Sequence, residues 1–99
     1  MQTPWGASQI IRNLNGTGCL RVDCAGHGGI FVPDELLPRI PKAERKLAAR
    51  WSGSENWYEE DCCALSVLHH IPETRAERHT AEQVSEWHRG AVLNQLQRA

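Results

Sequence analysis

The stretch of sequence on which the fold depends reads Trp57-Tyr58-Glu59-Glu60-Asp61-Cys62-Cys63-Ala64-Leu65-Ser66-Val67-Leu68. It joins the densest aromatic and acidic cluster of the chain to its longest apolar run. The apolar part continues to Ile71, and Pro72 then ends it. Within it, apolar residues recur with the i, i+3, i+4, i+7 spacing of one helix face. The sequence therefore predicts a buried central helix.

The acidic residues of this stretch allow two interpretations. In the first, Glu59, Glu60 and Asp61 form the first turn of the central helix, where free N–H groups and the helix dipole favour negative charge. In the second, the same acids and Tyr58 form a recognition or acid/base patch on a rigid element. The sequence leaves both interpretations open.

Size and charge exclude several classes of protein. The 99 residues have the size of one domain, predicted to span residues 1–99. Eleven Lys and Arg residues against 12 Asp and Glu give a formal net charge of −1. This balance fits neither a nucleic-acid binder with a basic face nor a strongly acidic mimic of nucleic acid. No stretch has the length of a membrane span and the N-terminus lacks a secretion signal, so we expect a cytoplasmic protein with reduced cysteines.

Alternating apolar residues and turn signals predict a small sheet in the first third of the chain. Residues 8–12 form a first strand, and the Asn15-Gly16 pair favours a hairpin because both residues tolerate positive φ. Residues 18–24 alternate as the return strand, and residues 30–32 form a third strand. The result is a three-stranded antiparallel meander.

Two further helices are predicted to flank the central one. Residues 34–37 form at most a single turn with Asp34 as N-cap, and residues 42–51 form an amphipathic helix. The buried stripe of that helix is predicted as Ala43, Leu47 and Trp51. The last helix begins with the capping-box pattern Thr80-Ala81-Glu82-Gln83, and Gly90 weakens its middle. Its apolar side is predicted to comprise Val84, Trp87, Ala91, Val92 and Leu96. The predicted fold class is therefore α+β, with the meander packed against the central buried helix.

Gly26-His27-Gly28-Gly29 is the most unusual local feature of the chain. Three glycines leave the imidazole beside accessible backbone N–H groups, so the segment could hold an anion, a carbonyl group or the backbone of a partner. His27 could also serve as a general base oriented by an acidic residue of the central stretch. The alternative is a tight bend between two strands with His27 on the surface.

Metal binding is a further alternative, because several Cys and His residues are types that bind zinc. These candidate ligands are Cys19, Cys24, His27, Cys62, Cys63, His69 and His70. Their spacing is poor for zinc, since no C-x-x-C pair occurs. His69 and His70 are explained as favourable partners of a helix C-terminus. We therefore expect neither a metal nor another cofactor.

Three blocks of the sequence resemble a family of small domains without assigned function, met mostly on bacterial plasmids, phages, prophages and integrative elements. The blocks are Thr3-Pro4-Trp5-Gly6 with Ser8-Gln9, then Gly26-His27-Gly28-Gly29, then Trp57-Tyr58-Glu59-Glu60-Asp61-Cys62. The resemblance covers roughly residues 3–72. It implies that many such proteins act against host defence, including restriction and CRISPR systems. It points to Trp5, His27, Tyr58, Glu59, Glu60 and Asp61.

Together, these observations predict a small mobile-element protein that inhibits a bacterial defence complex by stoichiometric contact, in the manner of an anti-CRISPR or anti-restriction protein. The expected partner is a nucleic-acid-processing protein complex in the host cytosol, with no direct binding to nucleic acid or membrane. The predicted partner-binding residues are Trp57, Tyr58, Glu59, Glu60, Asp61 and His27. The alternatives are a small hydrolase or transferase that uses His27 with acids of the Trp57–Asp61 cluster, and a structural zinc-binding module.

Overall fold

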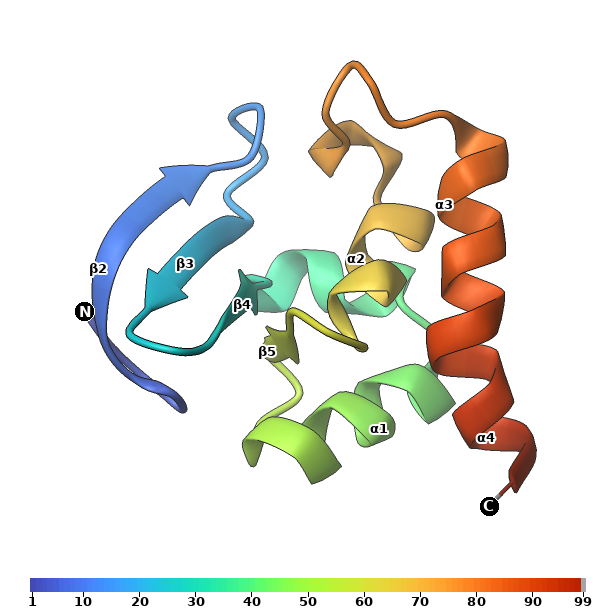
Figure 1. Cartoon of the computed structure of the whole chain (residues 1–99), viewed down its shortest axis with the longest axis horizontal. Helices are drawn as coiled ribbons and strands as arrows, with labels where there is room; N and C mark the ends of the chain where they lie inside the picture. Colours follow the sequence, from blue (N-terminus) through green and yellow to red (C-terminus); the bar gives the residue numbers. More distant parts are fainter. Residues whose placement is uncertain (99) are drawn as a thin grey trace.

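The strands of the protein form one antiparallel sheet in which neighbours along the chain are neighbours in space (Figure 1). The computed structural model describes residues 1–98. Its strands are β1 (Gln2–Thr3), β2 (Gly6–Asn13), β3 (Leu20–Cys24), β4 (Gly28–Phe31) and β5 (Trp57–Glu59). The predicted meander is thus confirmed and extended by a short strand at each edge. The fold class is α+β, as predicted.

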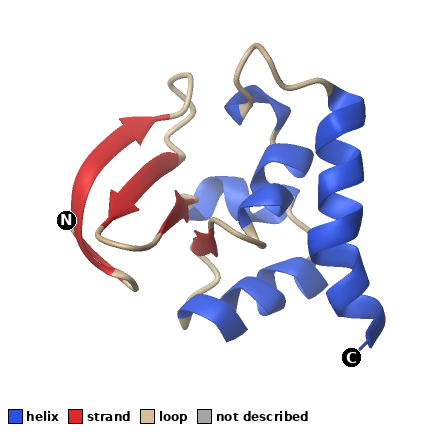
Figure 2. Cartoon of the chain, in the orientation of Figure 1, coloured by secondary structure: helices blue, strands red, loops and turns tan. Residues whose placement is uncertain are grey.

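The helices gather on the opposite side of the molecule from β1 and β2 (Figure 2). They are η1 (Asp34–Arg39), α1 (Lys42–Ser52), α2 (Ala64–His70), η2 (Pro72–Thr74), α3 (Ala81–His88), η3 (Arg89–Leu93) and α4 (Asn94–Arg98). Of these, η1 and η2 are 3₁₀ helices and η3 is a π-helical turn that joins α3 to α4 in one rod (Figure 1). Within residues 1–98, none of the helices combines the length and the apolar character needed to span a membrane.

The predicted local signals are present at two turns. Asn15 and Gly16 have φ values of 52° and 73°, which confirms the hairpin between β2 and β3. At the start of α3, the Thr80 side chain accepts a hydrogen bond from the Gln83 backbone while the Gln83 side chain accepts one from the Thr80 backbone. The predicted capping box is therefore confirmed.

The central stretch differs from its prediction at its acidic end. Trp57–Glu59 is not the start of a helix but β5, which pairs with β4. Glu60 to Cys63 form a turn, and α2 begins only at Ala64. Pairing with β4 satisfies the backbone groups of β5, and the strand's alternation sends Tyr58 into the core. The apolar half behaves as predicted, since Ala64, Val67 and Ile71 are buried.

The predicted buried face of α1 is confirmed at Leu47 and is wrong at Ala43 and Trp51. Glu44, Leu47 and Ala48 are buried, whereas Ala43 and Trp51 are exposed. The helix is rotated because Glu44 finds hydrogen-bond donors inside the protein, as described below.

The apolar side of the last helix also differs from its prediction. Trp87, which was predicted to belong to that side, is exposed, whereas the neighbouring His88 is buried.

Asp34 does not cap η1. Pro33 occupies the cap position, and the Asp34 carboxylate instead accepts a hydrogen bond from the Asn56 side chain at 2.8 Å. The backbone carbonyl of Val32 accepts a second bond from the same amide, also at 2.8 Å. Asn56 therefore ties the segment before β5 to the chain that follows β4.

The three sequence blocks of the family resemblance meet on the outer face of the sheet, away from the helices. Gly29 lies opposite both Val22 and Glu59 in neighbouring strands, so a side chain at this position would project to the same face as theirs. The ring of Trp5 covers that position and meets the ring of Trp57 edge-on, with centroids 5.7 Å apart. Gly29 of the second block is therefore explained by close packing of the first and third blocks.

This packing predicts that Gly29→Ala destabilises the protein. A Cβ atom at Gly29 would press against the carbonyl oxygen of Tyr58 and lie 2.5 Å from the Cη2 atom of Trp5. Overpacking of this kind costs about 1–3 kcal/mol of unfolding free energy, to be measured by urea denaturation. Gly90→Ala is the matched control, since its added Cβ meets nothing within 4 Å. An equal loss of stability in both variants would contradict the packing explanation.

Candidate functional site

A buried carboxylate lies at the centre of the helical layer. The side chain of Glu44 accepts three hydrogen bonds, from the Ser66 hydroxyl at 2.8 Å, from His70 Nε2 at 3.0 Å and from His88 Nε2 at 2.5 Å. Ser66 and His88 bond to Oε1, and His70 bonds to Oε2. Glu44 and His88 are only 4% and 3% exposed. Both carboxylate oxygens are therefore occupied by donors and are removed from solvent.

The members of this cluster come from three helices. Glu44 lies in the first turn of α1, and Ser66 and His70 lie one turn apart on α2, so their side chains point to the same side. His88 is the last residue of α3, directly before the π-helical turn around Gly90. Glycine is a weak helix former, and π-helical turns in proteins often lie at functional sites. The cluster thus joins the three main helices.

The hydrogen bonds keep Glu44 ionised. Burial alone would raise the pKa of this carboxyl group, but the bonds from His88 and Ser66 and the neighbouring His70 outweigh burial and lower the pKa to about 2. An ionised carboxylate can only accept, so both imidazoles present an N–H group to it. The site is a negative charge held by three polar side chains inside the protein.

A third imidazole lies against this cluster. The ring of His69 stacks on that of His88, with centroids 4.2 Å apart and planes 6° apart, and meets His70 edge-on at 4.7 Å. Burial lowers the pKa of His69, which disfavours its charged form. Its Nδ1 atom is buried and has no hydrogen-bond partner among residues 1–98. Three imidazoles therefore surround one carboxylate.

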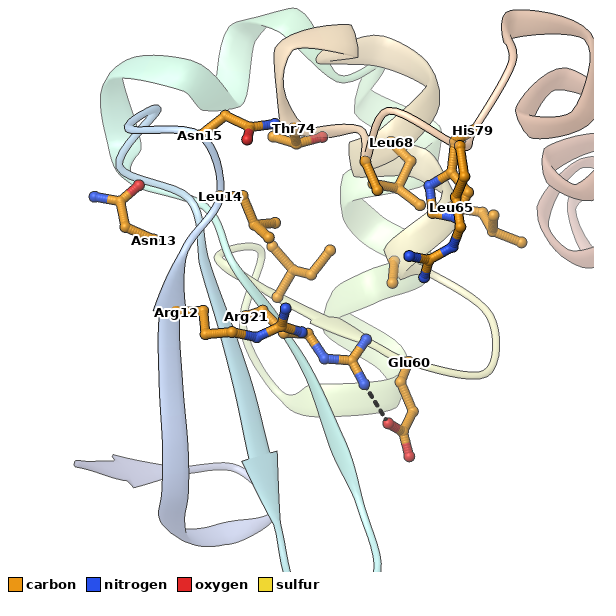
Figure 3. Close-up of a pocket in the computed structure, with 14 residues that line it drawn as sticks. Arg12, Asn13, Leu14, Asn15, Arg21, Glu60, Leu65, Leu68, Thr74 and His79 are labelled. Atoms are coloured by element: carbon orange, nitrogen blue, oxygen red, sulfur yellow. Dashed lines mark hydrogen bonds and ion pairs between the residues drawn. The ribbon is translucent and has the colours of Figure 1, made fainter.

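A cleft of about 360 Å³ lies elsewhere, between the β2–β3 hairpin and the chain around α2 and η2 (Figure 3). Leu14, Leu65 and Leu68 give it apolar walls, and Arg12 and Arg21 also line it (Figure 3). Arg21 forms ion pairs with Glu60 at 2.8 Å and with Asp23 at 3.2 Å. The charge of Arg21 in this cleft is therefore compensated within the protein.

The predicted partner-binding residues are divided between the core and the surface. Tyr58 is fully buried and Glu59 is 6% exposed, with its carboxylate accepting a bond from the Asp61 backbone at 3.1 Å. Burial also raises the pKa of Glu59. Trp57 is half-buried, and Asp61 is exposed. The accessible part of the predicted patch is therefore smaller than the sequence suggests, since Glu60 is also engaged with Arg21.

His27 lies in the exposed turn between β3 and β4. Within residues 1–98, its ring hydrogen-bonds to none of the acidic side chains that the enzyme hypothesis assigned to it. The turn itself is closed by a bond from the Cys24 backbone N–H to the His27 carbonyl at 2.7 Å. The local structure is thus the tight bend that was the alternative interpretation.

Sequence reasoning did not identify Glu44, Ser66 and His88 as site residues. Of the seven predicted zinc ligands, only His70 takes part in the cluster, and His69 lies beside it. One signal was available, because Glu44 precedes Leu47 and Ala48 by three and four residues and so shares their helix face. The i, i+4 spacing of Ser66 and His70 on a helix predicted to be buried was a second signal.

These features define a small α+β domain with a buried carboxylate–imidazole cluster among its helices and an aromatic cluster on its sheet. The chain belongs to the family described as a domain of unknown function, DUF7007, which matches residues 1–95. Membership in a family without assigned function was predicted, and the match also includes the segment after Pro72. Comparisons with the curated proteins and with the solved structures find no match.

The hydrogen bonds to Glu44 predict that Ser66→Ala lowers the stability of the protein. Ser66 is fully buried and its hydroxyl donates to a charged acceptor, a bond worth about 1.5–3 kcal/mol. Chemical denaturation measures the loss. Ser85→Ala, at a partly exposed position of α3, should stay within about 0.5 kcal/mol of the parent protein. Equal stability of Ser66→Ala and the parent would show that the Ser66 bond contributes nothing.

Proposed function

We propose that this domain acts by stoichiometric binding to a protein complex of bacterial defence, and that the contact is made by the outer face of its sheet. The observation that supports this proposal is a patch of partly exposed apolar side chains. The patch, termed here the outer aromatic face, consists of Trp5, Ile11, Leu20, Phe31 and Trp57.

The register of the strands places these side chains together. Leu20 lies opposite Phe31, which lies opposite Trp57, and residues opposite each other project to the same face. Ile11 lies opposite Val22, two residues along β3 from Leu20 and hence on that face as well. The ring of Trp57 contacts the rings of both Phe31 and Trp5, with centroids 5.2 Å and 5.7 Å away.

Such a face is suited to binding a protein. Aromatic side chains that are already packed against one another lose little conformational freedom on association, and they supply most of the energy at many interfaces. Contiguous apolar patches on a protein surface commonly mark interaction sites. Because the net charge is −1, the chain favours local contact over mimicry of a whole nucleic-acid duplex.

An acidic residue can assist this contact. Asp61 follows β5 closely in the chain, is exposed, and forms no ion pair with Lys or Arg among residues 1–98. A carboxylate in this position would attract the Lys and Arg residues that line a groove for phosphate, and would accelerate association. The mobile-element resemblance supports the choice of partner, because many proteins of that setting act against nucleic-acid-processing defence complexes.

Copurification from a bacterial host, followed by mass spectrometry, tests the proposal directly. Tagged protein should recover a component of a defence complex in a fixed ratio, and gel filtration of the purified pair should show one complex. A partner unrelated to defence would refute the assignment of the partner class. Recovery of no partner under conditions in which the protein inhibits defence would refute stoichiometric binding.

Two neighbouring isoleucines of β2 allow a sharp test of the outer aromatic face. Ile11 projects to this face and is 45% exposed, whereas Ile10 is 55% exposed and projects to the opposite face. Ile11→Lys should weaken partner binding about tenfold or more, because it places a charge in an apolar contact. Ile10→Lys, on the same strand, should leave the affinity within about threefold. Calorimetry or surface plasmon resonance measures both, and a reversed order would reject this face.

The electrostatic contribution predicts a separate effect of Asp61→Lys. Charges at the edge of an interface act mainly on the association rate, so this variant should associate more slowly at low salt and differ less from the parent at high salt. Stopped-flow association measured at two salt concentrations checks the prediction. Association that is equally slow at both concentrations would point to a structural defect instead of a lost attraction.

A further inference from the structure

We infer that Glu44, His70 and His88 form a binding site for one divalent transition-metal ion, with zinc the best fit. The site lies among the helices and does not depend on the proposed function of the outer aromatic face. It also differs from the zinc site considered from the sequence, which relied mainly on cysteines. Two imidazoles and one carboxylate are a ligand set that zinc accepts.

The geometry of the donors carries this inference. One carboxylate oxygen and one nitrogen of each ring converge from three different helices, and all lie within 4.8 Å of one another. In a tetrahedral zinc site with bonds of about 2.0–2.1 Å, the ligand atoms are roughly 3.3 Å apart. His88 Nε2 lies 2.5 Å from Oε1 of Glu44 and His70 Nε2 lies 3.0 Å from Oε2, so these contacts must open by less than about 1 Å. Any wider pair of ligand atoms must close from at most 4.8 Å to the same spacing.

Binding of the ion involves a simple exchange of protons. Without metal, both imidazoles present N–H groups to the carboxylate; with metal, each ring presents the Nε2 lone pair and carries its proton on Nδ1. No net proton is then released from neutral rings. Ser66 keeps its hydrogen bond to the carboxylate, at 2.8 Å, and holds Glu44 in position as supporting residues of metal sites do.

The site is closed on two sides and open on the third. The side chains of Glu44 and His88 are 5% and 4% exposed, whereas that of His70 is 21% exposed. An ion can therefore enter past His70, and a water molecule can complete the coordination there. One buried ring, one half-buried ring and a buried charge are costly to keep in a small core, and a bound ion would be coordinated by all three side chains.

Within the described part of the chain, the Nδ1 atom of His69 is an unpaired polar atom beside the cluster. It is buried without a partner among residues 1–98, although the ring stacks on His88. Buried polar atoms are rarely left unpaired in proteins.

Zinc binding to protein pretreated with a chelator tests the inference. Isothermal titration and elemental analysis after dialysis should show one zinc ion per chain. His70→Asn and Glu44→Gln should each weaken zinc binding at least about tenfold. His27→Ala and His79→Ala, which remove imidazoles outside the cluster, should bind zinc like the parent. Circular dichroism verifies folding, and the half-buried His70 makes His70→Asn the decisive variant if Glu44→Gln does not fold.

Cysteines are the competing source of zinc binding. Cys24 is the one partly exposed thiol among the four, so Cys24→Ser should bind zinc like the parent. Cobalt substitution should give a spectrum without the strong thiolate charge-transfer band. The inference is overturned if the parent binds no stoichiometric zinc, if His70→Asn binds zinc as tightly as the parent, or if the thiolate band appears and is lost in Cys24→Ser.

Discussion

The helical layer depends on the neutralisation of one buried charge. Glu44 is removed from solvent by its position between α1 and α2, and an ionised carboxylate without partners in that position would be strongly unfavourable. Its donors come from α2 and α3, and the three bonds satisfy both oxygens. A change in the position of any of these helices leaves a donor or the carboxylate unpaired. The polar cluster therefore fixes a packing that Leu47, Val67 and other apolar contacts alone would specify less uniquely.

Local signals predicted the first third of the fold well, because the residues that decide it are neighbours in sequence. The hairpin of β2 and β3 is specified locally, by the Asn15-Gly16 turn and by the alternation of residues 20–24. β5 was missed for the opposite reason. Its three residues are too few for alternation to be recognised, and the partner that makes them a strand lies in β4, in a different part of the chain. The acidic residues that follow Tyr58 are also typical of the first turn of a helix.

The candidate site was missed because apolar periodicity assigns every charged residue to the surface. Glu44 belongs to the buried face of α1, and it does so only because Ser66, His70 and His88 lie 22, 26 and 44 positions away in the sequence. The position of His70 at a helix C-terminus was enough to explain it from the sequence. Its hydrogen bond to Glu44 was therefore not predicted. Gly29 near His27 shows the reverse case, in which part of an unusual sequence that suggests chemistry is explained by the packing of Trp5.

The two proposed sites lie on opposite sides of the same sheet. Ile30 and Tyr58 are opposite each other in β4 and β5, and both are buried in the apolar core that lies between the sheet and the helices. The outer aromatic face is supported from beneath by this core, while the polar cluster lies among the helices behind it. A closely packed core resists small deformations, so an ion bound at Glu44 would stabilise the helices with little displacement of Trp57. Occupancy of the inner site should therefore affect the stability of the domain more strongly than the affinity of its outer face for a partner, which makes the two proposals physically separable.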